Sequence, residues 1–271
     1  MGKVLGIVGS PRRGGLTGSL VNKALRGVES AGVETEVIYL IDRNIEPCLD
    51  CRGKTCWTTG SCRFGDDSVA LNRELDLCSG VVLAAPVYYL NVNGLTQKFM
   101  EKTRVRDVNG KPAFGIAVAG GTGKGLISAL QSIYRFLTIV GFRGIDPLPV
   151  SRFNAQRALE RAYLTGRRLG ELARGPRSPF KDLAERIAWY ASLEYMGFDI
   201  VDENLFLARL VLENAAPSSE ADEALLREAR LECSRAERLV GEGRRAEAVE
   251  HIIAAYDRGV QVWRRLERGH R

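Results

Sequence analysis

Four cysteines lie close together in the segment EPCLDCRGKTCWTTGSC, with the spacing C-x2-C-x4-C-x5-C: Cys48, Cys51, Cys56 and Cys62. Cysteines spaced this closely in a protein expected to be cytoplasmic indicate a metal site or redox chemistry rather than disulfides. Sets of four thiolates hold [4Fe–4S] clusters or tetrahedral zinc. We therefore consider three states for this segment: first a [4Fe–4S] cluster, then no metal, with the thiols vestigial or forming a redox-active pair, and last zinc.

A second candidate site lies in GIVGSPRRGGLTGSL, residues 6–20. A strand, a glycine-rich turn and a helix in this order aim backbone N–H groups at an anion. Ser10 and Thr17 add hydroxyls, and Arg12 adds a charged fork that suits phosphate. The turn contains no G-x-G-x-x-G, and GGTGKG at 120–125 does not complete a Walker motif, which argues against a dinucleotide site and a nucleotide hydrolase.

Two further loops follow later apolar runs. APVYYLNVNGLTQKF, residues 85–99, contains tyrosines and asparagines that suit a flat polar ring. AGGTGKG, residues 119–125, has glycines that permit a ligand to approach the backbone closely. Taken alone, the tyrosines of the first loop could equally be core aromatics, and the glycines of the second could equally form a plain tight turn.

Apolar runs that alternate with helical patterns position these loops. Strands are predicted at 4–9, 35–40, 80–89, 112–120 and 144–150, helices at 17–31, 67–78, 93–104 and 124–140, and a long loop at 41–66. Continuous apolar strands separated by helices predict an α/β fold with a doubly wound, five-stranded parallel sheet. Such sheets bind ligands at the carboxyl ends of their strands, where all three loops lie.

After Asn154 the strand patterns stop. A helix is predicted over 154–174, and Ser178-Pro179 has the pattern of a helix start. Ser219 is placed to cap another helix, and Gly241-Glu-Gly243 separates two apolar stripes, which predicts a helical hairpin. We therefore expect a domain over 1–153, with its cysteine-rich loop at 46–65, and an all-helical extension over 154–271.

Composition narrows the function. The chain has 39 Lys and Arg against 33 Asp and Glu, and most of this positive excess lies in residues 1–150, which favours an anionic ligand there. The later, arginine-rich residues are nearly balanced in charge and do not predict nucleic-acid binding. Both histidines, His251 and His270, follow residue 250, which argues against a histidine-dependent hydrolase in the first domain. Without a signal-peptide pattern or a membrane span, we expect a cytoplasmic protein with no membrane partner.

Taken together, the motifs of residues 1–150 resemble the flavodoxin-like family of NADPH-dependent FMN reductases and iron–sulfur flavoproteins. Gly9-Ser10-Pro11-Arg12 is similar to the family's segment at the FMN phosphate, with Thr17 retained and Leu16 replacing an asparagine. The isoalloxazine pattern of the family resembles Pro86-Val87-Tyr88, Gly94 and Lys98-Phe99, and the third glycine loop resembles Gly120-Gly121-Thr122-Gly123.

The resemblance implies an oxidoreductase in which bound FMN, rather than a side chain, carries the chemistry. The FMN contacts that it implies are Ser10, Arg12, Leu16, Thr17, Pro86, Val87, Tyr88, Tyr89, Asn91, Gly120, Gly121 and Thr122. It also implies NAD(P)H or an electron-carrier protein as partner, and a homodimer or homotetramer.

Iron–sulfur flavoproteins carry a similar cysteine set in the same loop, but their second gap is usually two residues, whereas here it is four. The resemblance thus allows electrons to pass through a [4Fe–4S] cluster. The alternative function is a non-catalytic flavodoxin-like module whose helical extension binds a partner.

Overall fold

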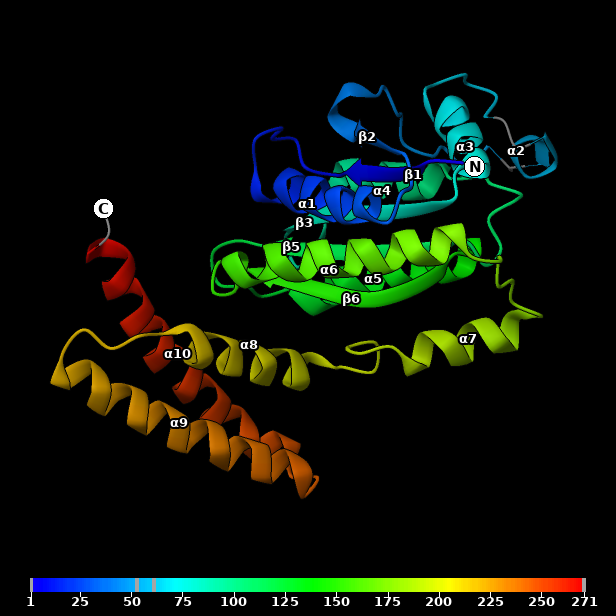
Figure 1. The fold of residues 1–271 in the computed structure, drawn as a ribbon. Helices are drawn as coiled ribbons and strands as arrows, with labels where there is room; N and C mark the ends of the chain where they lie inside the picture. The colour runs from blue at the N-terminus through cyan, green and yellow to red at the C-terminus, as the bar shows by residue number, and fades with distance from the viewer. Residues whose placement is uncertain (1, 52–53, 60–61, 270–271) are drawn as a thin grey trace. The chain divides into compact units, whose positions relative to one another are not determined.

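The chain forms a mostly parallel sheet with flanking helices, and further helices follow (Figure 1). The computed structural model describes residues 2–51, 54–59 and 62–269. The strands are β1 (Val4–Val8), β2 (Thr35–Tyr39), β3 (Gly80–Tyr88), β4 (Asn91–Val92), β5 (Pro112–Ala119) and β6 (Arg143–Ser151). The helices are α1 (Leu16–Ser30), the 3-10 helix η1 (Leu40–Asp42), α2 (Lys54–Thr59), α3 (Ser68–Leu77), α4 (Gly94–Lys102), α5 (Leu126–Val140), α6 (Ala155–Arg174), α7 (Leu183–Ser192), α8 (Ile200–Asn214), α9 (Glu220–Gly241) and α10 (Arg245–Gly269).

The strand order is β2-β1-β3-β5-β6, and β4 pairs with β3 outside this path. The pairs β1–β2, β1–β3 and β3–β5 are parallel, whereas β3–β4 is antiparallel. Without β4, this is the flavodoxin-like order. The predicted doubly wound, five-stranded sheet is therefore confirmed. The additional β4 is two residues long, too short to leave a periodic pattern in the sequence.

Helices cover both faces of the sheet because alternate residues of a strand point to opposite sides. On β5, Phe114 and Ile116 belong to a core cluster shared with residues of α1 and α6. Between them, the backbone N–H of Gly115 donates to the hydroxyl of Tyr134 on α5 over 3.1 Å. Accordingly, α1 and α6 lie on one face and α5 lies on the other.

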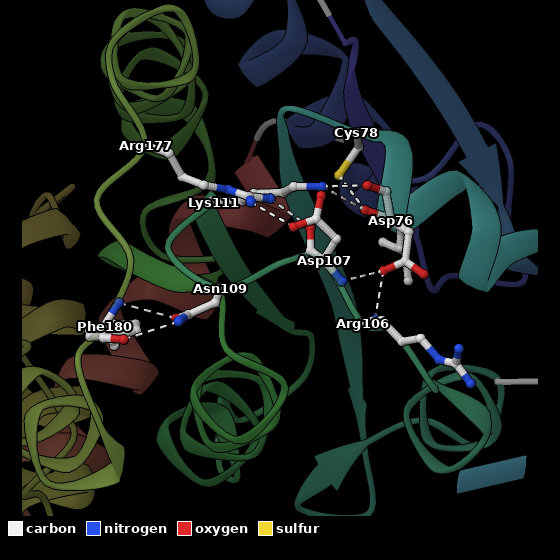
Figure 2. Close-up of polar contacts among 9 residues, drawn as sticks. Asp76, Cys78, Arg106, Asp107, Asn109, Lys111, Arg177 and Phe180 are labelled. Atoms are coloured by element: carbon white, nitrogen blue, oxygen red, sulfur yellow. Dashed lines mark hydrogen bonds and ion pairs between the residues drawn. The ribbon is translucent and has the colours of Figure 1, made fainter. Parts of the chain in front are cut away.

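Helix α7 begins at Leu183, capped by Asp182, whose side chain accepts from the backbone N–H of Glu185. The prediction of a helix start at Ser178-Pro179 is therefore wrong. The later start of the helix is explained by a contact of Phe180 with Asn109, a residue far away in the chain. The Asn109 side chain donates to the Phe180 carbonyl over 3.0 Å and accepts from the Phe180 N–H over 3.1 Å, so this side chain holds the backbone of Phe180 (Figure 2).

The predicted loop over 41–66 contains the six-residue helix α2, which the sequence does not predict. On α2, the Trp57 ring lies 4.3 Å from the guanidinium carbon of Arg104, and the Thr58 carbonyl accepts from the side chain of Arg106. These contacts from outside the segment favour a helical turn that a glycine- and cysteine-rich sequence does not predict locally. Residues 52–53 and 60–61 of this loop lie outside the described residues.

The chain divides into two compact units. The first comprises residues 1–120, 125–150 and 155–197, and the second comprises 121–124, 151–154 and 198–271. The predicted boundary at residue 153 placed α6 in the extension, whereas α6 packs on α1 and belongs with the sheet. This close packing depends on Gly166, where a Cβ would lie 2.0 Å from the carbonyl oxygen of Ala24.

The second unit contains α8, α9 and α10, which pack on one another. Ser219 caps α9, and the chain turns after Gly241, so the predicted hairpin of α9 and α10 is confirmed. Ion pairs lie on the surface of this unit, as between Arg209 of α8 and Glu237 of α9 at 2.6 Å. With such charged faces, none of the described helices is long and apolar enough to cross a membrane.

Candidate functional site

The carboxyl ends of β1, β3 and β5 meet at one edge of the sheet. Val8 of β1 pairs with Ala84 of β3, and Pro86 of β3 pairs with Val118 of β5, all in parallel register. The predicted loops that leave these strands at Gly9, after Pro86 and at Gly120 therefore start at the same edge. This is the position at which doubly wound sheets bind their ligands.

The first loop leads into an uncapped helix. Helix α1 follows Gly15, and it has neither a side-chain cap nor an acidic residue in its first turn. Ser10 before the helix and Thr17 in its first turn are buried, and the Ser10 hydroxyl accepts from the backbone N–H of Arg12 over 3.1 Å. The N–H groups of the first helical turn thus present partial positive charge with no carboxylate from α1 to offset it.

The two arginines of this loop have different environments. Arg13 pairs with Asp42 at 2.5 Å and stacks on the Tyr39 ring, with its guanidinium carbon 5.3 Å from the ring centroid. Arg12 is exposed and makes no ion pair within the described residues. The prediction of Arg12 as the anion partner is therefore consistent with the structure, because Arg13 is already paired with Asp42 whereas Arg12 is exposed.

A buried amide holds this loop in place. Asn93 donates to the Gly9 carbonyl over 2.8 Å and accepts from the hydroxyl of Thr96 over 2.7 Å. Asn93 and Thr96 are 3% and 0% exposed, so these bonds are shielded from water. The sequence alone does not predict a role for either residue. An Asn directly before a helix with Thr three residues later was the available signal, and it suggests a cap rather than a contact with Gly9.

The second loop is a strained two-residue hairpin between β3 and β4. Tyr89 and Leu90 have φ values of 51° and 69°, in the left-handed region that favours glycine or asparagine. Both are exposed, Tyr89 completely, and neighbouring Tyr88 is half exposed. Strained backbone of this kind occurs preferentially at ligand sites. Two aromatic rings are therefore held in solvent beside the edge where the first loop begins.

Asn91 and α5 brace this hairpin. The Asn91 side-chain oxygen accepts from the Val92 N–H and from the Ser132 hydroxyl, each over 2.8 Å. Gly125, which precedes α5, packs so closely that a Cβ there would lie 2.3 Å from the Leu90 Cα. Asn91, predicted as a ligand contact, thus has its oxygen engaged within the protein, and its amide N–H groups remain the donors for a ligand.

Replacing Tyr89-Leu90 by Asn-Gly is expected to raise the free energy of unfolding by about 1–2 kcal/mol, because both new residues accept positive φ. The Leu90 backbone, not its side chain, faces Gly125, so no packing is lost there. Urea unfolding followed by circular dichroism measures the change. Tyr89→Phe retains the strain and should match the wild type; equal stability of all three proteins would show that the turn is not strained.

The third loop divides between the units. Gly120 follows β5 in the first unit, is exposed, and would have no atom within 4 Å of an added Cβ. Gly121 and Thr122 belong to the second unit. There the Thr122 carbonyl accepts from the Tyr256 hydroxyl over 2.5 Å, and a Cβ on Gly123 would lie 2.9 Å from Leu207.

The four predicted cysteine ligands line one pocket of the first unit, together with Leu49, Arg63, Phe64, Lys102 and Arg104. None of them forms a disulfide. Cys48 and Cys51 are exposed, and Cys56 and Cys62 are partly buried. As they stand, no three His, Cys, Asp or Glu side chains in the described part of the chain are arranged to hold a metal ion. The structure thus brings the thiols to one pocket, without a preformed metal-ligand set.

A buried lysine contacts this pocket. Lys102 donates to the Cys62 sulfur over 3.1 Å and pairs with Asp66 at 2.9 Å. Burial raises the pKa of Cys62, but hydrogen bonds from the Phe64 N–H and Lys102 favour the thiolate, and the net shift of the pKa is downward. Burial lowers the pKa of Lys102, but its bonds to Asp66 and Cys62 raise it, with a net upward shift.

The remaining cysteines lie apart from this pocket. Cys78 and Cys233 are buried. Cys78 lies near the amino end of β3 beside Lys111, whose ammonium donates to the Asp76 carbonyl over 2.6 Å (Figure 2). Burial raises the pKa of Cys78 to about 11, so the thiol stays protonated.

Known proteins resemble part of this chain. The family model described as NADPH-dependent FMN reductase matches residues 2–147. An iron–sulfur flavoprotein of Methanocaldococcus jannaschii is 28% identical over 190 residues, which cover 64% of this chain and 97% of that protein. An iron–sulfur flavoprotein of Archaeoglobus fulgidus is 34% identical over 126 residues, which cover 45% of this chain and 56% of that protein.

Solved structures confirm the fold. A flavone reductase superposes with a TM-score of 0.50 at 19% identity, covering 63% of this chain and 62% of that one. RosB, solved with a bound riboflavin-5'-phosphate intermediate, superposes with the same TM-score of 0.50 at 19% identity, covering 70% of this chain and 86% of that one. From the family match, which spans more than half of the sequence, the chain belongs to the NADPH-dependent FMN reductase family and is a flavin-dependent oxidoreductase.

Proposed function

We propose that this protein binds FMN at the carboxyl edge of the sheet and uses NAD(P)H as electron donor. The observation that carries the proposal is the uncapped start of α1 beside the buried hydroxyls of Ser10 and Thr17, at the same edge as the exposed tyrosine hairpin. The helix start and Arg12 would hold the FMN phosphate, with Leu16 contributing its backbone N–H. Pro86, Val87, Tyr88, Tyr89 and Asn91 would contact the ring.

Gly120 is exposed at the same edge and is open enough to let a ring lie against its backbone. Gly121 and Thr122, which the family resemblance also assigns to the flavin, stay predictions. Bound FMN supplies the exchange of one or two electrons, and the residues of the chain bind and orient it. The family match supports an enzyme and does not favour the alternative of a non-catalytic module.

We further propose that the cysteine pocket holds a [4Fe–4S] cluster, which passes electrons between the flavin and an acceptor. Four thiols with no carboxylate or histidine among the described lining residues form the donor set that such clusters use. Three cations line the same pocket: Arg63, Lys102 and Arg104. Their charge suits an anionic thiolate-bound group. Ligation would require the thiols to converge further. A homodimer or homotetramer stays a prediction.

The test is the visible spectrum of protein purified without oxygen, before and after dithionite, together with iron, zinc and FMN assays. We expect about one FMN and about four irons per chain, with flavin bands on a broad cluster absorption. Flavin without iron would contradict the cluster and leave the FMN site intact. A protein that neither contains FMN nor takes up added FMN would contradict the proposed site at Ser10 and Thr17.

Leu16→Asn is expected to tighten FMN binding about tenfold, because a side-chain amide at the start of α1 would add one hydrogen bond to the charged phosphate. Leu16→Ala removes the same partial packing on the core without adding an amide, so it serves as the matched control. The dissociation constant is measured by quenching of FMN fluorescence on the apoprotein. Equal affinities for the two variants would place the phosphate elsewhere.

A further inference from the structure

Lys102, the last residue of α4, is buried with its charge intact. Its side chain is 5% exposed, and that of its partner Asp66 is 3% exposed. Removing an ammonium from water is costly unless other groups satisfy it. Asp66 supplies one such partner at 2.9 Å, and the second polar contact of the ammonium is the Cys62 sulfur at 3.1 Å. The charge therefore faces the cysteine pocket.

The surroundings of Asp66 leave Lys102 directed at the sulfur. One Asp66 oxygen accepts from Lys102 and from the Glu46 N–H, the latter over 3.0 Å. The other oxygen accepts from the Ser68 N–H over 3.1 Å and from the Ser68 hydroxyl. With all these donors in place the carboxylate is fixed. It holds the ammonium on one side, and the ammonium can donate toward Cys62 on the other.

A second cation at the pocket is also fixed. Arg104 stacks on Trp57 and donates to the carbonyl oxygens of Glu101 and Thr103 over 2.9 and 2.7 Å. Arg104 therefore contributes a general positive field. Lys102 differs from it by donating directly to a thiol of the pocket.

We propose that Lys102 is a positioning residue that raises the reduction potential of the cluster at Cys48, Cys51, Cys56 and Cys62. This inference rests on the proposed cluster. A cluster that took up one electron, supplied by NAD(P)H through the flavin, would become more negative by one charge, and no covalent bond of the protein would change. A fixed ammonium that donates to a ligating sulfur stabilises the more negative state, and hydrogen bonds to cluster sulfurs are a known determinant of potential.

The experiment is a redox titration of the anaerobically purified full chain, with the cluster followed by electron paramagnetic resonance. Lys102→Met is combined with Asp66→Asn, so that no buried carboxylate is left without its partner. We expect the reduction equilibrium to shift about tenfold toward the oxidised state, which for one electron lowers the midpoint by about 59 mV. Lys102→Arg keeps the charge and should restore most of the potential.

Lys181→Met removes one lysine charge from the exposed surface of the same unit and should leave the midpoint unchanged. A double variant with wild-type iron content and an unchanged midpoint would overturn the role of Lys102 and leave the cluster in place. Absence of iron from the wild type would overturn both. A folded double variant without iron, beside an iron-loaded Lys102→Arg, would overturn the proposal by showing that the ion pair holds the cluster in place rather than setting its potential.

Discussion

Gly166→Ala is expected to lower the free energy of unfolding by about 3 kcal/mol or more and to weaken FMN binding at the same time. An added methyl group would lie 2.0 Å from the carbonyl oxygen of Ala24, on the backbone of α1. The same contact is tight from the other side, where a Cβ on Gly27 would lie 2.1 Å from the Tyr163 carbonyl oxygen. Backbone atoms cannot rotate away, so α6 and α1 must separate. Because α1 begins at the proposed phosphate site, its displacement moves that site.

Gly175→Ala is the matched control, since a Cβ there would meet its nearest atom, the Glu171 carbonyl oxygen, at an ordinary 3.6 Å. Urea unfolding followed by circular dichroism gives the stability, and fluorescence titration of the apoprotein gives the FMN affinity. If Gly166→Ala remained within about 1 kcal/mol of Gly175→Ala, the close packing of α1 on α6 would be contradicted.

Gly9→Ala is expected to weaken FMN binding about tenfold or more and to destabilise the protein by about 1–3 kcal/mol. The new Cβ would lie 2.0 Å from the Thr96 hydroxyl oxygen and 3.1 Å from the Ala84 carbonyl oxygen. Thr96 must move, and its hydrogen bond to Asn93 then breaks, together with the hold of Asn93 on the Gly9 carbonyl. The loop between β1 and α1 loses the contact that fixes it.

A second substitution tests this explanation. Thr96→Ala removes the clashing oxygen, so Gly9→Ala with Thr96→Ala should recover part of the FMN affinity that Gly9→Ala alone loses. Gly14→Ala, in the same loop, would have no atom within 4 Å of its Cβ and should preserve stability. If the double variant bound FMN no better than Gly9→Ala, the effect would arise from the backbone of the loop itself rather than from Thr96.

Much of the first unit could be predicted because its signals are local. The strands β1, β3 and β5 are buried along most of their length, and such strands appear in a sequence as continuous apolar runs between helical patterns. The turn into α1 is equally local, since the strand end, the glycines and the first helical turn are neighbours in the chain. The fold class and the position of the anion-binding turn followed from these patterns.

Element bounds that depend on distant partners could not be predicted. Helix α7 starts at Leu183 because Asn109 holds the backbone of Phe180, and no nearby residue signals that pairing. Helix α6 joins the sheet because Gly166 fits against α1. In both cases the deciding group lies tens of residues away, so the local pattern is compatible with more than one outcome.

The sequence by itself determined the chemical groups available: four thiols in one segment, hydroxyls and glycines after the first strand, and tyrosines after the third. These follow from residue type and spacing. Only the tertiary structure decided which other side chains contact these groups. Asn93 holds the Gly9 loop, and Lys102 contacts Cys62, only because the two ends of α4 pack beside segments far away in the chain. No spacing rule encodes such contacts, since they arise when the sheet and its helices assemble.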